Sequence, residues 1–182
     1  TRSVVYVKPD YWIVIDRLTG KGEHHFDQYW HLSEKSIDRV EIKESGNIAT
    51  APHLNMFSLG NIPDVRLEQT HLSFNYREKV LAPVIRYSLH GAVPVVWPTV
   101  LFPLESNGSN VNVTSISVEE LQGNTLLSKP VAIRVISNDS KDYFFEQEQA
   151  GFRCRFDNFE TDAKAVLVSV DAQDEIIENC IF

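Results

Sequence analysis

The stretch YWIVIDRLTGKGEHHFDQYWHL, residues 11–32, decides the fold class, because its apolar residues are spaced for strands. Residues 11–18 form a strand-like segment that opens with five β-branched and aromatic side chains, and residues 24–32 place Phe26, Trp30 and Leu32 on one face of a strand. The segment 19–22 between them holds two glycines, which tolerate the positive φ angles of a tight turn. Together with the apolar residues 3–8, this stretch predicts a three-stranded meander.

The rest of the chain repeats short apolar runs that Gly, Pro, Asn and Asp separate. No stretch keeps a long 3.6-residue apolar period, and only a helical turn at 118–123 is expected. Pro83, Pro94 and Pro98 indicate sheet edges, bulges or strand starts, since proline lacks a backbone N–H. We therefore predict a single all-β domain over residues 1–182, folded as an antiparallel β-sandwich. Further strands are expected at 38–42, 54–58, 65–69, 81–90, 93–102, 111–118, 131–137, 165–170 and 175–182.

The charge of the chain limits its partners. Seventeen Lys and Arg against twenty-five Asp and Glu give a net charge of −8, which argues against gripping nucleic acid or an anionic membrane. No apolar run approaches the roughly 18 to 20 residues that span a bilayer. The chain starts at Thr1 without Met and enters a strand-like run by Val4, so we expect a fragment of a longer protein.

Tyr29 and His31 are candidate substrate-binding residues. Alternate residues of a strand point to opposite sides of the sheet, so both lie opposite the apolar face of Phe26, Trp30 and Leu32. Tyr and His also carry acid and base chemistry near neutral pH. A purely structural role stays open, in which His31 donates to a backbone carbonyl and Tyr29 packs against a second layer.

The spacing of the histidines predicts no metal site. His24 and His25 are adjacent and point to opposite faces, whereas His25 and His31 lie about 20 Å apart along a regular strand. The sequence also lacks paired cysteines at zinc-finger spacing, a Gly-rich phosphate loop, HExxH and GxSxG. Phosphoryl transfer, metalloprotease and serine hydrolase chemistry therefore have no support.

The remaining candidates are aromatic, charged and sulfur-containing side chains. Trp97, between two prolines, is a candidate for stacking on a sugar ring, whereas Trp12 and Trp30 are expected to pack in the core. We expect Asp16, within an apolar run, to form an ion pair. The apolar neighbours of Cys154 favour a buried thiol over a disulfide with Cys180.

Three blocks of the sequence point to a known family: RSVVYVKPDYWIVIDRLTG (2–20), HFDQYWHL (25–32) and VPVVWPTVLFP (93–103). In composition and order they resemble the C-terminal region of the heparinase II/III-like family of bacterial polysaccharide lyases. The resemblance covers about residues 1–103, and 104–182 is recognisable only as further strands. It implies an N-terminal α-helical toroid followed by antiparallel β-sheet domains. It also implies cleavage of uronic-acid polysaccharides, such as heparan sulfate or alginate, by β-elimination.

The resemblance carries over no catalytic residue. In the family the catalytic Tyr lies in the toroid, and the catalytic and metal-binding His lie upstream of the block that opens this chain. We therefore expect no cofactor in this chain, and any divalent metal of the parent protein would be bound upstream. β-Elimination needs a base, an acid and neutralisation of the uronate carboxylate, so the chain alone is expected to be inactive.

We expect the C-terminal β-sandwich of a periplasmic or secreted lyase, supporting the catalytic domain or forming one wall of the cleft. The implied partners are the N-terminal helical domain of the same chain and the polysaccharide. The substrate-binding candidates are Tyr29, His31 and Trp97, and no catalytic residue is assigned. Two alternatives remain: a non-catalytic carbohydrate-binding or adhesion module, and a self-sufficient lyase that uses Tyr29 and His31.

Overall fold

The computed structural model describes residues 1–43, 45–60, 64–104, 110–121, 128–137 and 140–182. Of these residues 64% are in strands and 2% in helix, in several antiparallel sheets, which confirms the predicted all-β class. The chain forms two compact units. Unit 1 comprises Thr1–Asp16, Gly20–Val93 and Trp97–Asn107, and unit 2 comprises Arg17–Thr19, Pro94–Val96 and Gly108–Phe182.

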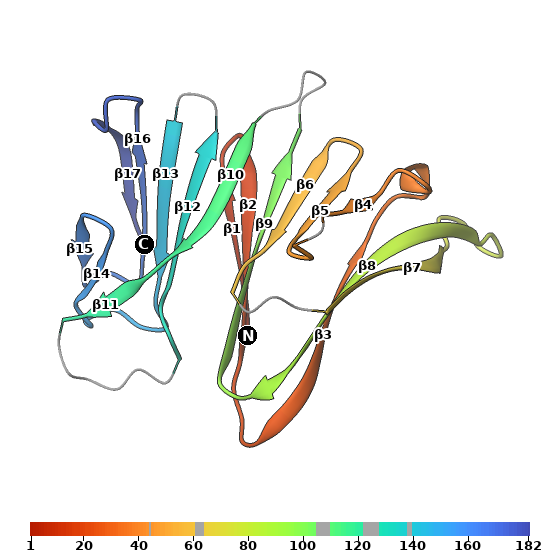
Figure 1. The fold of residues 1–182 in the computed structure, drawn as a ribbon, viewed down its shortest axis with the longest axis horizontal. Helices are drawn as coiled ribbons and strands as arrows, with labels where there is room; N and C mark the ends of the chain where they lie inside the picture. The colour runs from red at the N-terminus through yellow and green to blue at the C-terminus, as the bar shows by residue number, and fades with distance from the viewer. Residues whose placement is uncertain (44, 61–63, 105–109, 122–127, 138–139) are drawn as a thin grey trace. The chain divides into compact units, whose positions relative to one another are not determined.

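The first sheet has six strands in the order β1-β2-β9-β6-β5-β4 (Figure 1). Its second strand opens with five apolar residues, 11–15, because both of its faces are buried there: Tyr11, Ile13, Val14 and Ile15 are all inaccessible to solvent or nearly so. Most of this sheet belongs to unit 1, while the ends of β2 and β9 group with unit 2. The strands are β1 Arg2–Val7, β2 Tyr11–Leu18, β4 Glu41–Ile42, β5 Ile48–Ala51, β6 Leu54–Ser58 and β9 Val95–Pro103.

The second sheet of unit 1 has the order β3-β8-β7, and Figure 1 shows β3 running beside β8. Its strands are β3 Glu23–His31, β7 Asp64–Leu72 and β8 Val80–Ala92. The predicted meander is therefore wrong: β1 pairs with β2, but β3 pairs with β8 and not with β2. The turn itself is as predicted, with Gly22 at a φ of 83°. The chain uses this turn to pass from one sheet to the other.

Gln28 connects the two sheets of unit 1 through hydrogen bonds. This side chain of β3 is 4% exposed, and its Nε2 donates to Asp16 Oδ2 of β2 at 2.9 Å. Its Oε1 accepts from Thr99 Oγ1 of β9 at 3.2 Å and from Trp30 Nε1 at 3.0 Å. Since the inward face of β3 is fixed by these bonds, the outward face is held in place as well.

Asp16 forms the expected ion pair, and its partner is Arg2. The Arg2 Nη2 to Asp16 Oδ2 distance is 2.6 Å, and Arg2 Nε donates to Asp16 Oδ1 at 2.7 Å. Burial raises the pKa of Asp16, but the hydrogen bonds from Arg2 and Gln28 outweigh it, so the pKa lies below its usual range. The Arg2 guanidinium also lies 5.8 Å from the ring centre of Trp30, which is half-buried.

Two of the three prolines lie inside sheets and not at edges. Pro83 is in β8, the central strand of its sheet, and Pro98 is in β9, between β2 and β6. Each sits where one neighbouring ladder ends: Pro83 O accepts from Leu32 N at 3.0 Å, and Pro98 O accepts from Leu59 N at 2.9 Å. Pro94 directly precedes β9, as predicted for a strand start.

Unit 2 contains a five-stranded sheet, β10-β12-β13-β16-β17, and a three-stranded sheet, β11-β14-β15. The helical turn expected at 118–123 is wrong for its described part, because Val118–Glu120 is a strand that pairs with Cys154–Phe156. A short 3-10 helix, η1 Glu34–Ser36, lies in unit 1 instead. The strands of unit 2 are β10 Val111–Ile116, β11 Val118–Glu120, β12 Val131–Ser137, β13 Ser140–Glu146, β14 Cys154–Phe156, β15 Phe159–Thr161, β16 Ala165–Val170 and β17 Ile176–Ile181.

The core of unit 2 is built from aromatic and β-branched side chains of these strands. Phe145 and Phe156 stack with ring centres 5.0 Å apart, and Cys154 is fully buried in the same cluster. Burial raises the pKa of the Cys154 thiol. Cys154 and Cys180 are both free, in agreement with the buried-thiol interpretation. Among the described residues, no helix is long and apolar enough to cross a membrane.

Candidate functional site

The exposed side of the β3–β8 pair brings histidine, tyrosine, serine and charged side chains together. The antiparallel register places His25 opposite His90, Asp27 opposite Ser88, and Tyr29 opposite Arg86. Because side chains alternate along a strand, these residues share one face with His31. We call this set the outer face: His25, Asp27, Tyr29, His31, Arg86, Ser88 and His90.

Asp27 and Arg86 form the centre of the outer face. Arg86 donates from Nε and Nη2 to the two carboxylate oxygens of Asp27, at 3.1 Å each, and from Nη1 to Glu68 Oε1 of β7 at 3.3 Å. Ser88 Oγ donates to Asp27 Oδ1 at 2.6 Å. The hydrogen bonds from Arg86 and then Ser88 hold the pKa of Asp27 below its usual range, and those to Asp27 and Glu68 raise the pKa of Arg86.

Tyr29 offers an aromatic surface beside this network. Its side chain is 46% exposed, and the Arg86 guanidinium carbon lies 5.7 Å from its ring centre, within cation–π range. The structural alternative expected Tyr29 to pack against a second layer. Within the described residues its ring is instead partly open to solvent. Because Arg86 is itself held by two carboxylates, Tyr29 is supported on a fixed neighbour.

The structure brings two of the three predicted substrate-binding residues together. His31 is exposed two residues beyond Tyr29 on the same strand face, at the end of β3. Trp97 is elsewhere: it is 3% exposed, and its Nε1 donates to Ser58 Oγ of β6 at 2.8 Å. Because burial removes the indole face from ligands, we leave Trp97 out of the site that we propose.

Sequence analysis did not connect His90 with this site. His25 and His90 are 65 positions apart in the sequence, yet their ring centres lie 4.4 Å apart with the planes tilted by 46°. Likewise, Arg86 and Ser88 lie in the strand expected at 81–90, whose partner strand the sequence did not identify. The signal that was available is the alternation R-x-S-x-H at 86–90, which predicts one polar face of a strand.

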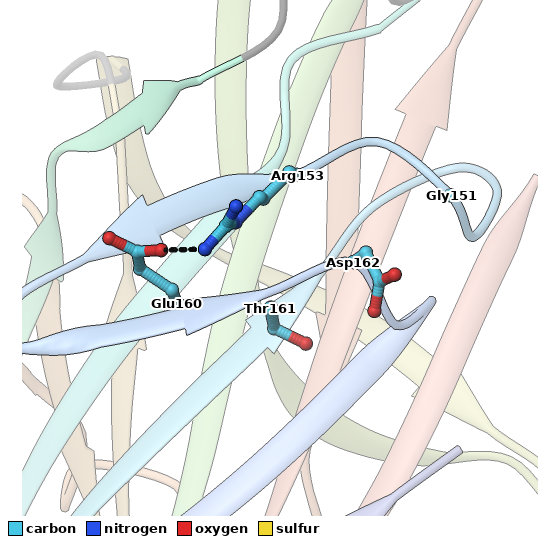
Figure 2. A pocket seen from close by; sticks show the side chains of 5 residues that line it. All are labelled: Gly151, Arg153, Glu160, Thr161 and Asp162. Atoms are coloured by element: carbon cyan, nitrogen blue, oxygen red, sulfur yellow. Dashed lines mark hydrogen bonds and ion pairs between the residues drawn. The ribbon is translucent and has the colours of Figure 1, made fainter.

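Unit 2 has a second candidate, a polar depression of about 380 Å³. Figure 2 shows Arg153 and Glu160 pointing toward each other, with an Nη2 to Oε2 distance of 2.7 Å. Its lining contains no aromatic ring, so it lacks a surface on which a sugar could stack. The residues that line it are Gly151, Arg153, Glu160, Thr161 and Asp162.

Comparison of the sequence with models of known protein families shows which of these two regions lies in a known family domain. The model of the heparinase II/III-like C-terminal domain matches residues 1–111 of the 182-residue chain. The chain belongs to the heparinase II/III-like C-terminal family. This match agrees with the resemblance noted for residues 1–103. A family domain defined as C-terminal implies a larger chain with other domains.

The position of the family match separates the two candidate sites. All seven residues of the outer face lie within 1–111, whereas the depression of Figure 2 lies outside it. A search of curated proteins found no match to the chain. The outer face is therefore the candidate that belongs to the heparinase II/III-like C-terminal domain itself.

The cations on and beside the outer face are already paired with carboxylates. Arg86 already faces the carboxylates of Asp27 and Glu68, with separations of 3.1 and 3.3 Å. Arg66, on the neighbouring β7, lies 3.2 Å from Asp64. Within the described ranges, no three His, Cys, Asp or Glu side chains are grouped to hold a metal ion.

Proposed function

We propose that this chain is the β-sandwich region of a lyase that cleaves uronic-acid-containing polysaccharide by β-elimination. Its own role is to support the catalytic domain and to form one wall of the substrate cleft. The observation that carries this proposal is the family membership over residues 1–111, which includes the whole outer face. The catalytic acid and base belong to other parts of the protein.

The properties of the outer face support a role as a cleft wall. Tyr29 offers an exposed ring against which the C–H groups of a sugar can pack. Around it, Ser88 and His31 supply polar groups for hydroxyls. The paired charges of Asp27, Arg86 and Glu68 keep the ring in place, so little conformational entropy is lost when a sugar binds.

The same features argue against a catalytic role for this face. Arg86 would have to leave two carboxylates before it met the carboxylate of a uronate, at the cost of three hydrogen bonds. A general acid or base is also useful only when a partner positions it beside the reacting carbon. We therefore place Tyr29 and His31 in substrate binding and not in proton transfer.

The proposed context is a periplasmic or secreted protein in which an N-terminal helical domain precedes this chain. That domain would hold the catalytic residues, and the polysaccharide would lie between it and the outer face. The family's definition as a C-terminal domain supports the presence of further domains. The location in the cell follows from the substrate, because an intact polysaccharide is met outside the cytoplasm.

The test compares the isolated chain with the full-length protein on heparan sulfate, heparin, hyaluronan and alginate. Product formation is followed by the ultraviolet absorbance of the unsaturated uronate. The full-length protein should be active on at least one of them. The isolated chain should show no turnover, because loss of a positioned acid or base costs about 100- to 10,000-fold each. Turnover by the isolated chain would overturn the assignment of the catalytic residues to another domain.

The rival function is a non-catalytic carbohydrate-binding or adhesion module, for which the exposed Tyr29 is equally suitable. The sequence encoded upstream of Thr1 distinguishes the two. A long segment with helical periodicity favours the lyase, and its absence favours the module. Activity measurements on the full-length protein give the same distinction, since a module binds polysaccharide without shortening it.

A further inference from the structure

The pair His25 and His90 forms a feature of the outer face that the proposed lyase role does not use. The two residues are directly opposite each other on the antiparallel strands β3 and β8, and both are exposed. Their ring centres are 4.4 Å apart, with the planes tilted by 46°. His24, the neighbour of His25, is directed elsewhere, since its Nε2 lies 2.9 Å from Lys21 O.

The spacing of the two ring centres is that of two imidazoles that share one metal ion. A Zn–N bond is about 2.0–2.1 Å long, which puts the centre of a bound imidazole about 3 Å from the metal. Two such rings at right or tetrahedral angles about the metal therefore have centres roughly 4–5 Å apart. The observed 4.4 Å lies within this range, and the exposed rings need only rotate so that one nitrogen of each faces the metal.

We propose that His25 and His90 together bind a borderline divalent transition-metal ion, with Zn²⁺ as the reference case. Imidazole nitrogen is a preferred ligand for Zn, Cu and Ni, and two imidazoles on adjacent strands bind as a chelate. The remaining coordination positions face solvent and take water or carboxylate oxygens. The nearby Asp27 carboxylate adds a favourable charge, while its own hydrogen bonds go to Arg86 and Ser88.

This inference revises the expectation that the chain holds no metal site. That expectation considered only His24, His25 and His31, which are close in sequence but spread along one strand. Pairing of β3 with β8 supplies the second ligand from far along the chain. With two protein ligands the site is exchangeable, which distinguishes it from a structural four-ligand site.

The test is a titration of the chelator-treated full chain with Zn²⁺, followed by isothermal calorimetry. We expect one equivalent to bind with the highest affinity, and His25→Ala or His90→Ala to weaken it by at least about tenfold. The double variant should be no weaker than either single one, because removing one ligand already destroys the chelate. Matched controls are His31→Ala and His71→Ala, each of which removes a single exposed histidine and should change the affinity by less than about twofold.

A second readout identifies the ligands without a variant. Substoichiometric Ni²⁺ should broaden the imidazole nuclear magnetic resonances of His25 and His90 before those of the other histidines. Circular dichroism of each metal-free variant checks folding, and His25→Gln replaces His25→Ala should the latter not fold. Equal broadening of all histidines, or unchanged Zn²⁺ affinity in His25→Ala and His90→Ala, would overturn the proposal.

Discussion

Replacing Gln28 by Leu should destabilise unit 1 strongly, because this side chain joins its two sheets. Gln28 makes three hydrogen bonds, to Asp16, Trp30 and Thr99, at 2.9, 3.0 and 3.2 Å. A typical hydrogen bond contributes about 1 kcal/mol net, and a buried donor left without a partner costs about 1–3 kcal/mol. Trp30 is half-buried and can regain water, so we expect a total loss of about 2–4 kcal/mol.

The assay is thermal or urea unfolding followed by tryptophan fluorescence. For a chain of this size, 1 kcal/mol corresponds to about 2–4 °C, so the melting temperature of unit 1 should fall by about 5–15 °C. Gln69→Leu is the matched control, since Gln69 is an exposed glutamine of the same sheet. It should change the stability by less than about 0.5 kcal/mol.

Gln28→Glu keeps the size and shape of the side chain, so it tests the hydrogen bonds of Gln28 separately from its packing. The introduced carboxylate keeps the acceptor for Trp30 and Thr99 but replaces the donor to Asp16 with a second negative charge. This variant should be less stable than the parent at pH 7 and recover as the pH falls, because protonation of one carboxylate removes the repulsion. If Gln28→Leu melted within about 1 °C of the parent, the hydrogen bonds of Gln28 would not contribute to the stability of unit 1.

Two further predictions concern Asp27 and Cys154. The hydrogen bond from Arg86 holds the pKa of Asp27 in the folded protein below the unfolded value of about 4. The Asp27 carboxylate therefore stabilises the fold fully above about pH 4, and this stabilisation is lost as the pH falls through the folded-state pKa. Asp27→Asn should therefore flatten the acid limb of the stability curve, measured by urea unfolding between pH 5 and pH 2, and an unchanged limb would refute the pairing. Cys154 is fully buried, so it should react with a thiol reagent only after denaturant is added. Peptide mass analysis identifies the labelled cysteine, and rapid labelling of Cys154 in the native protein would contradict its place in the core.

Local sequence patterns predicted most strands of unit 1, because burial on one or both faces leaves a direct trace in the order of side chains; they missed Ile48–Ala51, and of the strand expected at 38–42 only Glu41–Ile42 is present. The apolar run 11–15 reflects a strand buried on both faces, and the alternation at 24–32 reflects one inward face. The pairing of β3 with β8 left no such trace. A tight turn with glycines indicates that the chain reverses, but it does not specify whether the next strand stays in the same sheet.

Strand pairing, which local patterns do not specify, also explains the residues that the sequence did not reveal. Gln28 is the most buried residue of β3 although it is polar, because its partners Asp16 and Thr99 come from the opposite sheet. His90 and Arg86 gain their roles from the β3–β8 register, which joins positions about sixty residues apart. Polar residues on a strand reveal their function only when the residues across from them are known.

The missed strands of unit 2 have a related cause. Ser140–Glu146 is buried on both faces, including Asp142 and Glu146, so its polar residues concealed a core strand. Cys154–Phe156 and Phe159–Thr161 are each three residues long, too short for a periodic pattern. By contrast, the strand expected at 111–118 is present as Val111–Ile116, where apolar residues at alternate positions gave a readable pattern.

The central claim is that the outer face binds polysaccharide without taking part in the chemistry, and Tyr29→Ala in the full-length lyase tests it directly. Initial rates of β-elimination give kcat and KM for the parent, Tyr29→Ala and the ring-preserving control Tyr29→Phe. A stacking ring contributes about 0.5–1.5 kcal/mol, so Tyr29→Ala should raise KM roughly 2- to 10-fold and leave kcat within about twofold. Tyr29→Phe should resemble the parent. A fall in kcat of a hundredfold or more in both variants, with KM unchanged, would show that the Tyr29 hydroxyl does chemistry and would contradict the account.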